Sequence, residues 1–187
     1  MEIKRITAPI TREAAKSLRS GDSVLLSGEI YTARDAAHGR LVELLDKGEK
    51  LPIDIKDTVI YYVGPTPAKP GEVIGSAGPT TSYRMDAYAP RLIELGMTGM
   101  IGKGKRSGEV IESMKKHGAV YLGAIGGAAA LIAKCVTACE LVCYEDLGSE
   151  AIRKLTVKDF PLTVVIDSLG VNLYETGVKE YLASVKN

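Results

Sequence analysis

Short apolar runs alternate with segments of helical periodicity along most of the chain. The runs at 24–26, 58–63 and 162–167 are rich in leucine, β-branched and aromatic residues and are bounded by glycine, proline or aspartate, which is typical of strands. Residues 35–47 instead repeat leucine at spacings of three and four, which predicts a helix with one apolar side. Strands that alternate with helices predict an α/β fold with a layered mixed sheet and flanking helices.

Turn and capping residues divide the chain into further elements. Thr11 and Ser107 stand where a helix N-cap is expected, and Gly96 follows a third helical segment as a terminator. The predicted helices cover 13–18, 35–47, 86–95, 108–116, 127–138, 149–154 and the chain from about 174, and the predicted strands cover 24–26, 58–63, 97–101, 119–123, 140–144 and 162–167. Neither a repeat nor a shift in composition marks a boundary, so residues 1–187 are predicted to form one domain.

Charge and hydropathy exclude several kinds of partner. The chain has 24 basic and 23 acidic side chains, so a net charge of +1 gives no field that would attract nucleic acid or an anionic membrane. No apolar run approaches the roughly 20 residues that span a bilayer, and the N-terminus lacks the apolar core of a signal peptide. We therefore expect a cytoplasmic protein that binds neither nucleic acid nor membrane.

Three cysteines, Cys135, Cys139 and Cys143, lie within nine residues. On a continuous helix this spacing would align three thiolates, which can hold an iron–sulfur cluster. Residues 139–144 read as a strand, however, which would turn the thiols in different directions. We therefore favour small buried side chains over a metal site on this chain.

Two loops rich in glycine and proline carry the first candidate chemistry. They cover 64–70 and 75–82 and are separated by only four residues, so we expect them to lie close together. Glycine permits close approach of a ligand, and Thr80 and Thr81 offer hydroxyls just before the helix that is predicted to start near 83. A helix N-terminus binds anions readily. The alternative is that one of these hydroxyls only caps that helix.

Cations stand at three junctions between a strand and a helix. Arg84 follows the threonines, Arg34 lies in the junction at 31–38, and the loop at 102–107 carries Lys103 and Arg106. Arginine holds carboxylates through paired hydrogen bonds and lysine adds a point charge, so these junctions predict one face that binds a small dicarboxylate. Solvated surface charge is the alternative for each cation. His38, four residues after Arg34, is either part of this face or a structural hydrogen-bonding residue.

Several stretches resemble the class I, iron–sulfur fumarate hydratases, in particular their C-terminal domain. These stretches are TARDAAH at 32–38, YYVGPTPAKPGEVIGSAGPTTSYRMD at 61–86, GKGKRS at 102–107, GAIGG at 123–127 and DFPLTVVIDSLGVNLYE near the end. The resemblance runs over nearly the whole chain, and GPTT together with RMD is its specific signature. It implies a swivelling β/β/α domain. In two-subunit members this domain is a separate β subunit, and the length here resembles that form.

The resemblance also implies a partner and a reaction. The partner is an α subunit, in an assembly such as α2β2, whose three cysteines hold a [4Fe-4S] cluster, so the cysteines here have no ligand role. The reaction is the reversible hydration of fumarate to (S)-malate, a hydro-lyase step of the tricarboxylic acid cycle. Thr80 matches the proposed catalytic base, and Arg34, Arg84 and Lys103 match residues that bind the substrate carboxylates. Thr81, His38 and Arg106 remain further candidates.

Three alternatives remain. The β subunit of an L-tartrate dehydratase resembles this sequence and uses the same chemistry, although RMD followed by KGKRS resembles fumarases more. A mesaconate hydratase subunit is the second alternative. The third is a noncatalytic anion-binding or assembly module, against which the intact set of Thr80, Arg34, Arg84 and Lys103 argues.

Overall fold

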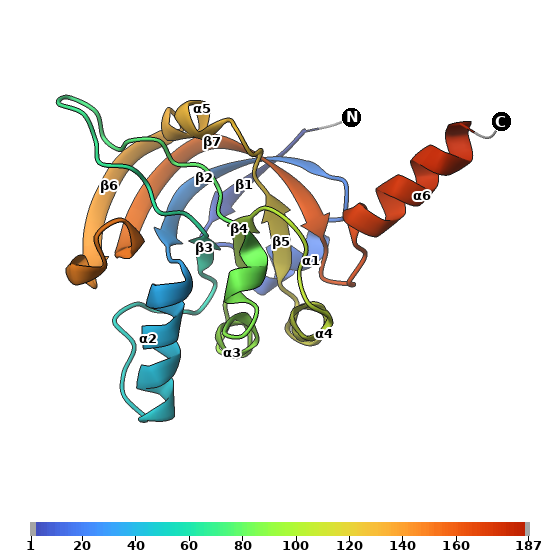
Figure 1. Cartoon of the computed structure of the whole chain (residues 1–187). Helices are drawn as coiled ribbons and strands as arrows, with labels where there is room; N and C mark the ends of the chain where they lie inside the picture. Colours follow the sequence, from blue (N-terminus) through green and yellow to red (C-terminus); the bar gives the residue numbers. More distant parts are fainter. Residues whose placement is uncertain (1–2, 186–187) are drawn as a thin grey trace.

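The computed structural model describes residues 3–185, which form one seven-stranded mixed sheet with helices around it (Figure 1). The strands are β1 (Ile3–Ala8), β2 (Ser23–Thr32), β3 (Val59–Tyr61), β4 (Gly99–Gly102), β5 (Val120–Gly123), β6 (Val136–Cys143) and β7 (Ile152–Ile166). The helices are α1 (Arg12–Ser17), α2 (Asp35–Asp46), α3 (Ala89–Glu94), α4 (Gly108–His117), α5 (Ala129–Ala133) and α6 (Leu173–Val185), with 3-10 turns η1 (Ser82–Met85) and η2 (Glu145–Glu150). The predicted α/β fold with flanking helices is confirmed.

The sheet curves back on itself because the long strand β7 pairs with β2, β5 and β6. The strand order is β1-β2-β3-β4-β5-β7-β6, and β1 to β5 run parallel to one another. β7 runs antiparallel to β5 and β6 and also pairs with β2 from Ser23↔Thr163 to Thr32↔Arg153. Strands β2, β3, β4, β5 and β7 therefore close into a ring, which appears as an arch in Figure 1.

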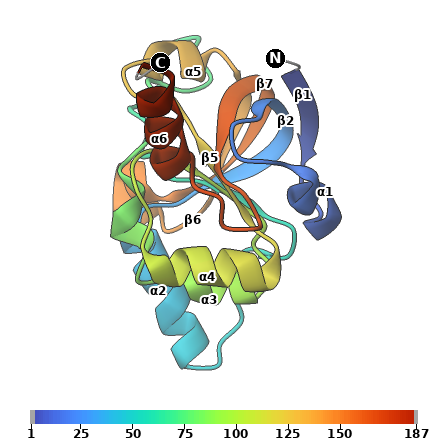
Figure 2. The same ribbon diagram turned by 90° about the vertical axis from the view of Figure 1, so that its right-hand side faces the viewer.

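Alternate residues of the short central strands enter two different cores. In β3, Val59 and Tyr61 pack inside the arch, whereas Ile60 faces the second core beneath it. The second core also contains buried side chains of α2, α3 and α4, which cover that side of the sheet, and α3 and α4 lie side by side in Figure 2. This period of two is the expected consequence of a sheet that is covered on both faces.

Local capping signals agree with the structure. The Thr11 hydroxyl accepts a hydrogen bond from the Ala14 amide at 3.2 Å, and the Ser107 hydroxyl accepts one from the Val110 amide at 3.3 Å. Gly118 ends α4 in the left-handed conformation, with φ of 76°. Across residues 3–185, none of the helices combines the length and the hydropathy that a membrane crossing requires.

Two predicted helices differ from the structure, and one strand was not predicted. The helix expected at 127–138 is limited to Ala129–Ala133, because Val136 already pairs with Val157. The helical piece expected at 149–154 lies earlier, as the 3-10 turn η2 at Glu145–Glu150, because Ile152 already begins β7. The N-terminal strand β1 was not predicted, and it lies beside β2 from Ile3↔Ser23 to Ala8↔Gly28.

Candidate active site

Hydrogen bonds between backbones bring Thr80 and Lys103 together. The Thr80 amide donates to the Tyr62 carbonyl at 2.7 Å, and the Lys103 amide donates to the Thr80 carbonyl at 3.3 Å. Thr81 and Lys103 form an isolated parallel bridge. The threonine segment thus lies between Tyr62, which follows β3, and the lysine loop that follows β4. Thr80 and Thr81 are half-buried and Lys103 is exposed.

Gly102 permits this close approach. A Cβ atom at Gly102 would lie 2.0 Å from the Ser82 hydroxyl oxygen and 3.1 Å from Tyr62 Cδ2, so a larger residue would displace the Ser82 hydroxyl. The Ser82 and Tyr121 hydroxyls are 2.9 Å apart, and Tyr121 in turn donates to the Gly104 carbonyl at 3.0 Å. The Ser82 and Tyr121 hydroxyls therefore form a hydrogen-bonded chain that holds the lysine loop at Gly104.

The expected helix N-terminus at the threonines is not present. Only the four-residue turn η1 follows Thr81, and α3 begins later at Ala89. The Thr81 side chain makes no capping hydrogen bond to η1. An anion at this point would therefore be held by side chains and individual amides rather than by a helix dipole, which the length of η1 cannot provide.

Arg34 and Arg84 are brought together by one carboxylate. The Arg84 Nη2 donates to Asp35 Oδ2 at 2.7 Å, and the Arg34 Nε lies 3.8 Å from Asp35 Oδ1. Arg34 also pairs with Glu150 through Nη2 at 3.1 Å. The predicted meeting of cations is thus observed for these two arginines, but two carboxylates that sequence reasoning did not name accompany them.

Gly64 provides the space that Arg34 occupies. A Cβ atom at Gly64 would lie 3.0 Å from Arg34 Nη1 and 3.1 Å from its Cδ. Because these distances are tighter than ordinary contacts, a larger residue at position 64 would press against the Arg34 side chain. The glycine in this loop therefore has a specific role beyond making a turn.

Arg106 does not lie on the exposed face. Its side chain is 0% exposed, and its Nε donates to Asp86 Oδ1 at 2.7 Å. The other Asp86 oxygen accepts from the Ser107 amide at 2.5 Å. The guanidinium also lies over the rings of Tyr62 and Tyr121, at 5.3 and 5.1 Å from their centroids. This ion pair fixes the end of the lysine loop against the residues that follow η1.

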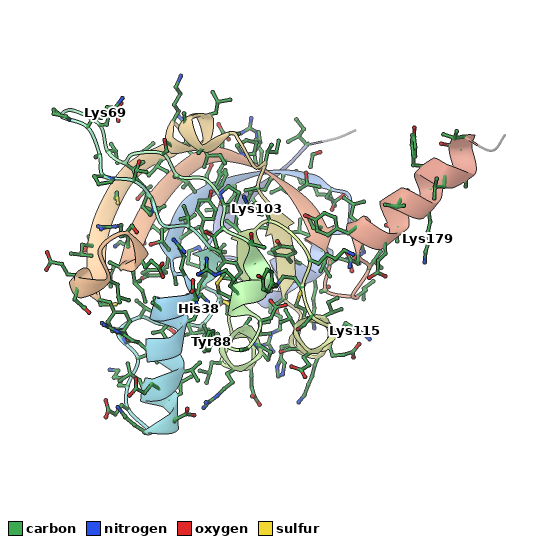
Figure 3. All side chains as sticks on the ribbon, in the orientation of Figure 1. His38, Lys69, Tyr88, Lys103, Lys115 and Lys179 are labelled. Atoms are coloured by element: carbon green, nitrogen blue, oxygen red, sulfur yellow. The ribbon has the colours of Figure 1, made fainter. Side chains whose placement is uncertain are left out.

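His38 is the fourth residue of α2 and is fully buried. Its Nδ1 is 2.8 Å from the Arg34 carbonyl and so carries the proton, which leaves Nε2 as a buried acceptor without a partner in the described chain. The ring packs edge-on against Tyr62 with centroids 5.3 Å apart, and Figure 3 shows it near Tyr88 and away from Lys103. Burial, with the nearby Arg106 cation, lowers the pKa of His38 to about 4. The imidazole is therefore neutral at pH 7.

The three cysteines pack as small apolar side chains. Cys135 follows α5 and packs with Cys139 against the core inside the arch, whereas Cys143 packs against the second core. Burial raises the pKa of each of the three thiols. Within residues 3–185, no three histidine, cysteine, aspartate or glutamate side chains are grouped so that they would hold a metal ion.

The partners that sequence reasoning missed are Asp35, Asp86 and Glu150. Asp35 was detectable as an acidic residue directly after a candidate arginine, in the first turn of a predicted helix. Nothing in the sequence indicated Glu150, because its contact with Arg34 forms only when η2 folds against α2. Asp35 thus joins Arg34 and Arg84, while backbone hydrogen bonds place Thr80 next to Lys103.

Comparison with known proteins identifies the family. The family model described as "Fumarase C-terminus" matches residues 1–177. The chain is 45% identical over 152 residues to the aerobic class I fumarate hydratase of Escherichia coli K12, which covers 80% of this chain and 28% of that protein. It is 42% identical over 156 residues to fumarate hydratase 2 of Leishmania major, covering 82% of this chain and 28% of that protein.

A third relative has a length close to that of this chain. The putative L(+)-tartrate dehydratase subunit beta of Methanocaldococcus jannaschii is 41% identical over 172 residues, covering 89% of this chain and 88% of that protein. By contrast, the chain spans only 28% of the length of the Escherichia coli relative. The match over residues 1–177 shows that this chain belongs to the family of fumarase C-terminal domains.

Proposed function

We propose that this chain is the β subunit of a two-subunit class I fumarate hydratase, which hydrates fumarate reversibly to (S)-malate. The observation that carries the proposal is the pair of arginines joined by Asp35, on the chain whose Thr80 and Lys103 are hydrogen-bonded neighbours. The identity to fumarate hydratases supports the reaction, and the relative from Methanocaldococcus jannaschii that is named a subunit beta supports a two-subunit enzyme.

The cations suit a substrate with two carboxylates. Arg84 and Arg34 can each donate parallel N–H bonds to a carboxylate, and the exposed Lys103 ammonium adds a third positive charge. In the direction of dehydration, a proton leaves the carbon next to a carboxylate of malate, and negative charge develops on that carboxylate. Fixed cations lower the energy of this charge as it forms.

Thr80 is the proposed base for that proton. A threonine hydroxyl is a weak base, so it requires cations nearby that stabilise its deprotonated form. Lys103 lies in the segment that is hydrogen-bonded to Thr80, and Arg84 is four residues after Thr80 in the sequence. In this proposal both cations would stabilise the hydroxyl oxygen as it loses its proton.

The [4Fe-4S] cluster belongs to the proposed α subunit in this account. The three cysteines here pack against different cores, and their thiols are held in the protonated form by burial. When bound by the partner, such a cluster supplies a Lewis acid. The α subunit, an assembly such as α2β2 and a location in the cytoplasm are parts of this proposal.

A subunit of an L-tartrate dehydratase is the second candidate. The match to the Methanocaldococcus jannaschii protein covers 88% of that protein, which is named a putative L(+)-tartrate dehydratase subunit beta. The test is to express the chain alone and with its α subunit, to reconstitute both anaerobically with iron and sulfide, and to assay fumarate, L-tartrate and mesaconate. We expect the complex to consume fumarate fastest, and the chain alone to bind no iron and to be inactive. Iron or turnover in the chain alone would contradict the division between subunits, and a complex without turnover would favour a noncatalytic module.

A further inference from the structure

Asp35 lies between the two arginines of the site. Its Oδ2 accepts a hydrogen bond from Arg84 Nη2 at 2.7 Å, while its Oδ1 lies 3.8 Å from Arg34 Nε. Asp35 is the first residue of α2, and Arg84 is 49 residues away in η1. One carboxylate therefore connects two cations that are carried by different elements.

The contact with Arg34 is incomplete. Arg34 Nε and Asp35 Oδ1 are both buried, and neither has a hydrogen-bond partner within residues 3–185. Their separation of 3.8 Å is roughly 0.9 Å longer than an ordinary N–H···O bond. Hydrogen bonds in active sites are often long without ligand and shorten in the complex with substrate. A small movement of Arg34 toward Asp35 would satisfy both atoms at once.

Asp35 need not leave when a substrate carboxylate arrives. A guanidinium has about five N–H donors, and Arg84 uses one of them on Asp35 while its side chain is 41% exposed. Asp35 is also favoured where it stands, since a negative charge in the first turn of a helix is stabilised by the helix dipole. These features fit a fixed bridge rather than a carboxylate that holds the place of the substrate.

We propose that Asp35 is a positioning residue that sets the separation of the Arg34 and Arg84 guanidinium groups, and that it thereby selects dicarboxylates over monocarboxylates. The inference rests on the proposed function, because it takes these arginines as the groups that bind the substrate. With Asp35 in place, two guanidinium groups face a ligand at a defined spacing, which only a molecule with two carboxylates can use fully.

The test is Asp35→Asn in the complex with the α subunit, which removes the charge and keeps the size of the side chain. We expect KM for fumarate to rise about tenfold, while kcat changes less than about threefold, because ligand positioning is lost and the base is intact. Inhibition by malonate, a dicarboxylate, weakens by a similar factor, and inhibition by acetate does not change. Asp35→Glu retains the charge and restores at least part of the preference for malonate.

The matched control is Asp46→Asn. Asp46 is the last residue of α2 and pairs with Arg91 at the surface, so it has the same residue type and the same kind of partner at the other end of the helix. This variant keeps the KM and the malonate preference of the unmodified complex. A general loss of folded protein would lower kcat in proportion to the folded fraction and would leave the ratio of malonate to acetate inhibition unchanged.

The outcomes separate the two proposals. If the unmodified complex does not hydrate fumarate, the proposed function fails, and binding of malonate and acetate measured by calorimetry still decides the role of Asp35. An unchanged preference for malonate in Asp35→Asn overturns the inference, as does tighter binding of dicarboxylates, which would make Asp35 a competitor of the substrate.

Discussion

The buried His38 makes the stability of the chain depend on pH in a defined window. Burial lowers the pKa of His38 from 6.5 to about 4 in the folded chain, and the positive charge of Arg106 acts in the same direction. Below pH 6.5 the unfolded chain binds a proton on this histidine that the folded chain does not bind until about pH 4. The free energy of unfolding therefore falls as the pH drops from 6.5 to 4, and this contribution is unaffected above that window.

The size of the loss follows from the two pKa values. For one group with a pKa of 6.5 unfolded and about 4 folded, linkage gives a loss of about 2 kcal/mol between pH 7.5 and pH 5. At pH values below both pKa values the loss reaches about 3.5 kcal/mol, since each pKa unit corresponds to about 1.4 kcal/mol.

Urea unfolding at pH 7.5, 6 and 5 tests this reasoning. His38→Asn retains a donor that can reach the Arg34 carbonyl but has no group that titrates in this range. We expect the unmodified chain to lose about 2 kcal/mol more than His38→Asn between pH 7.5 and pH 5. The control is His117→Asn, because the other histidine is half-exposed at the end of α4. Equal pH dependence in the unmodified chain and His38→Asn would refute the burial argument.

Two further variants test the support of the site. Gly64→Ala places a methyl group 3.0 Å from Arg34 Nη1, so KM for fumarate is expected to rise by about tenfold, with the unfolding free energy changed by less than about 1 kcal/mol. The control Gly108→Ala has open space around the new methyl group and leaves KM unchanged. Equal KM values in both variants would show that the space at Gly64 does not affect how Arg34 binds the substrate. Arg106→Met and Asp86→Asn each break the same buried ion pair, and each is expected to lower the free energy of unfolding in urea by about 3–5 kcal/mol. The double variant is expected to lower it by clearly less than the sum of the two single losses. Strict additivity would show that the two side chains are not coupled.

The sequence predicts the helices that are specified by residues close together in the chain, such as capping residues and leucine spacing. Thr11 and Ser107 cap helices as expected, and the leucine spacing of 35–47 gives α2. The chain 152–161 was not predicted as strand, because its polar residues and Pro161 obscure a period of two. Its pairing with β2 and β6 is formed by residues distant in sequence. The alanine-rich segment at 127–138 shows the same effect, since pairing of Val136 in the sheet overrides helix propensity.

The site residues likewise fall into those that the sequence predicts and those that only the folded structure shows. The cations at strand and helix junctions are visible in the sequence because each junction is local. Their partners are not, because Asp35 meets Arg84 and Glu150 meets Arg34 only when separate elements fold together. The buried state of Arg106 was also hidden, since its sequence neighbours in KGKR suggest a solvated basic loop, whereas Asp86 and two tyrosine rings enclose it.

The most direct test of the proposed division between subunits is Thr80→Ala in the reconstituted complex, with turnover of fumarate and iron content measured on the same sample. The account predicts that kcat falls by about a hundredfold or more, as expected when a catalytic base is removed, while iron content equals that of the unmodified complex. Thr137→Ala, at an exposed position of β6, is the matched control and is expected to keep the turnover. Unchanged turnover in Thr80→Ala, or loss of iron together with turnover, would contradict a base on this chain and a cluster on its partner.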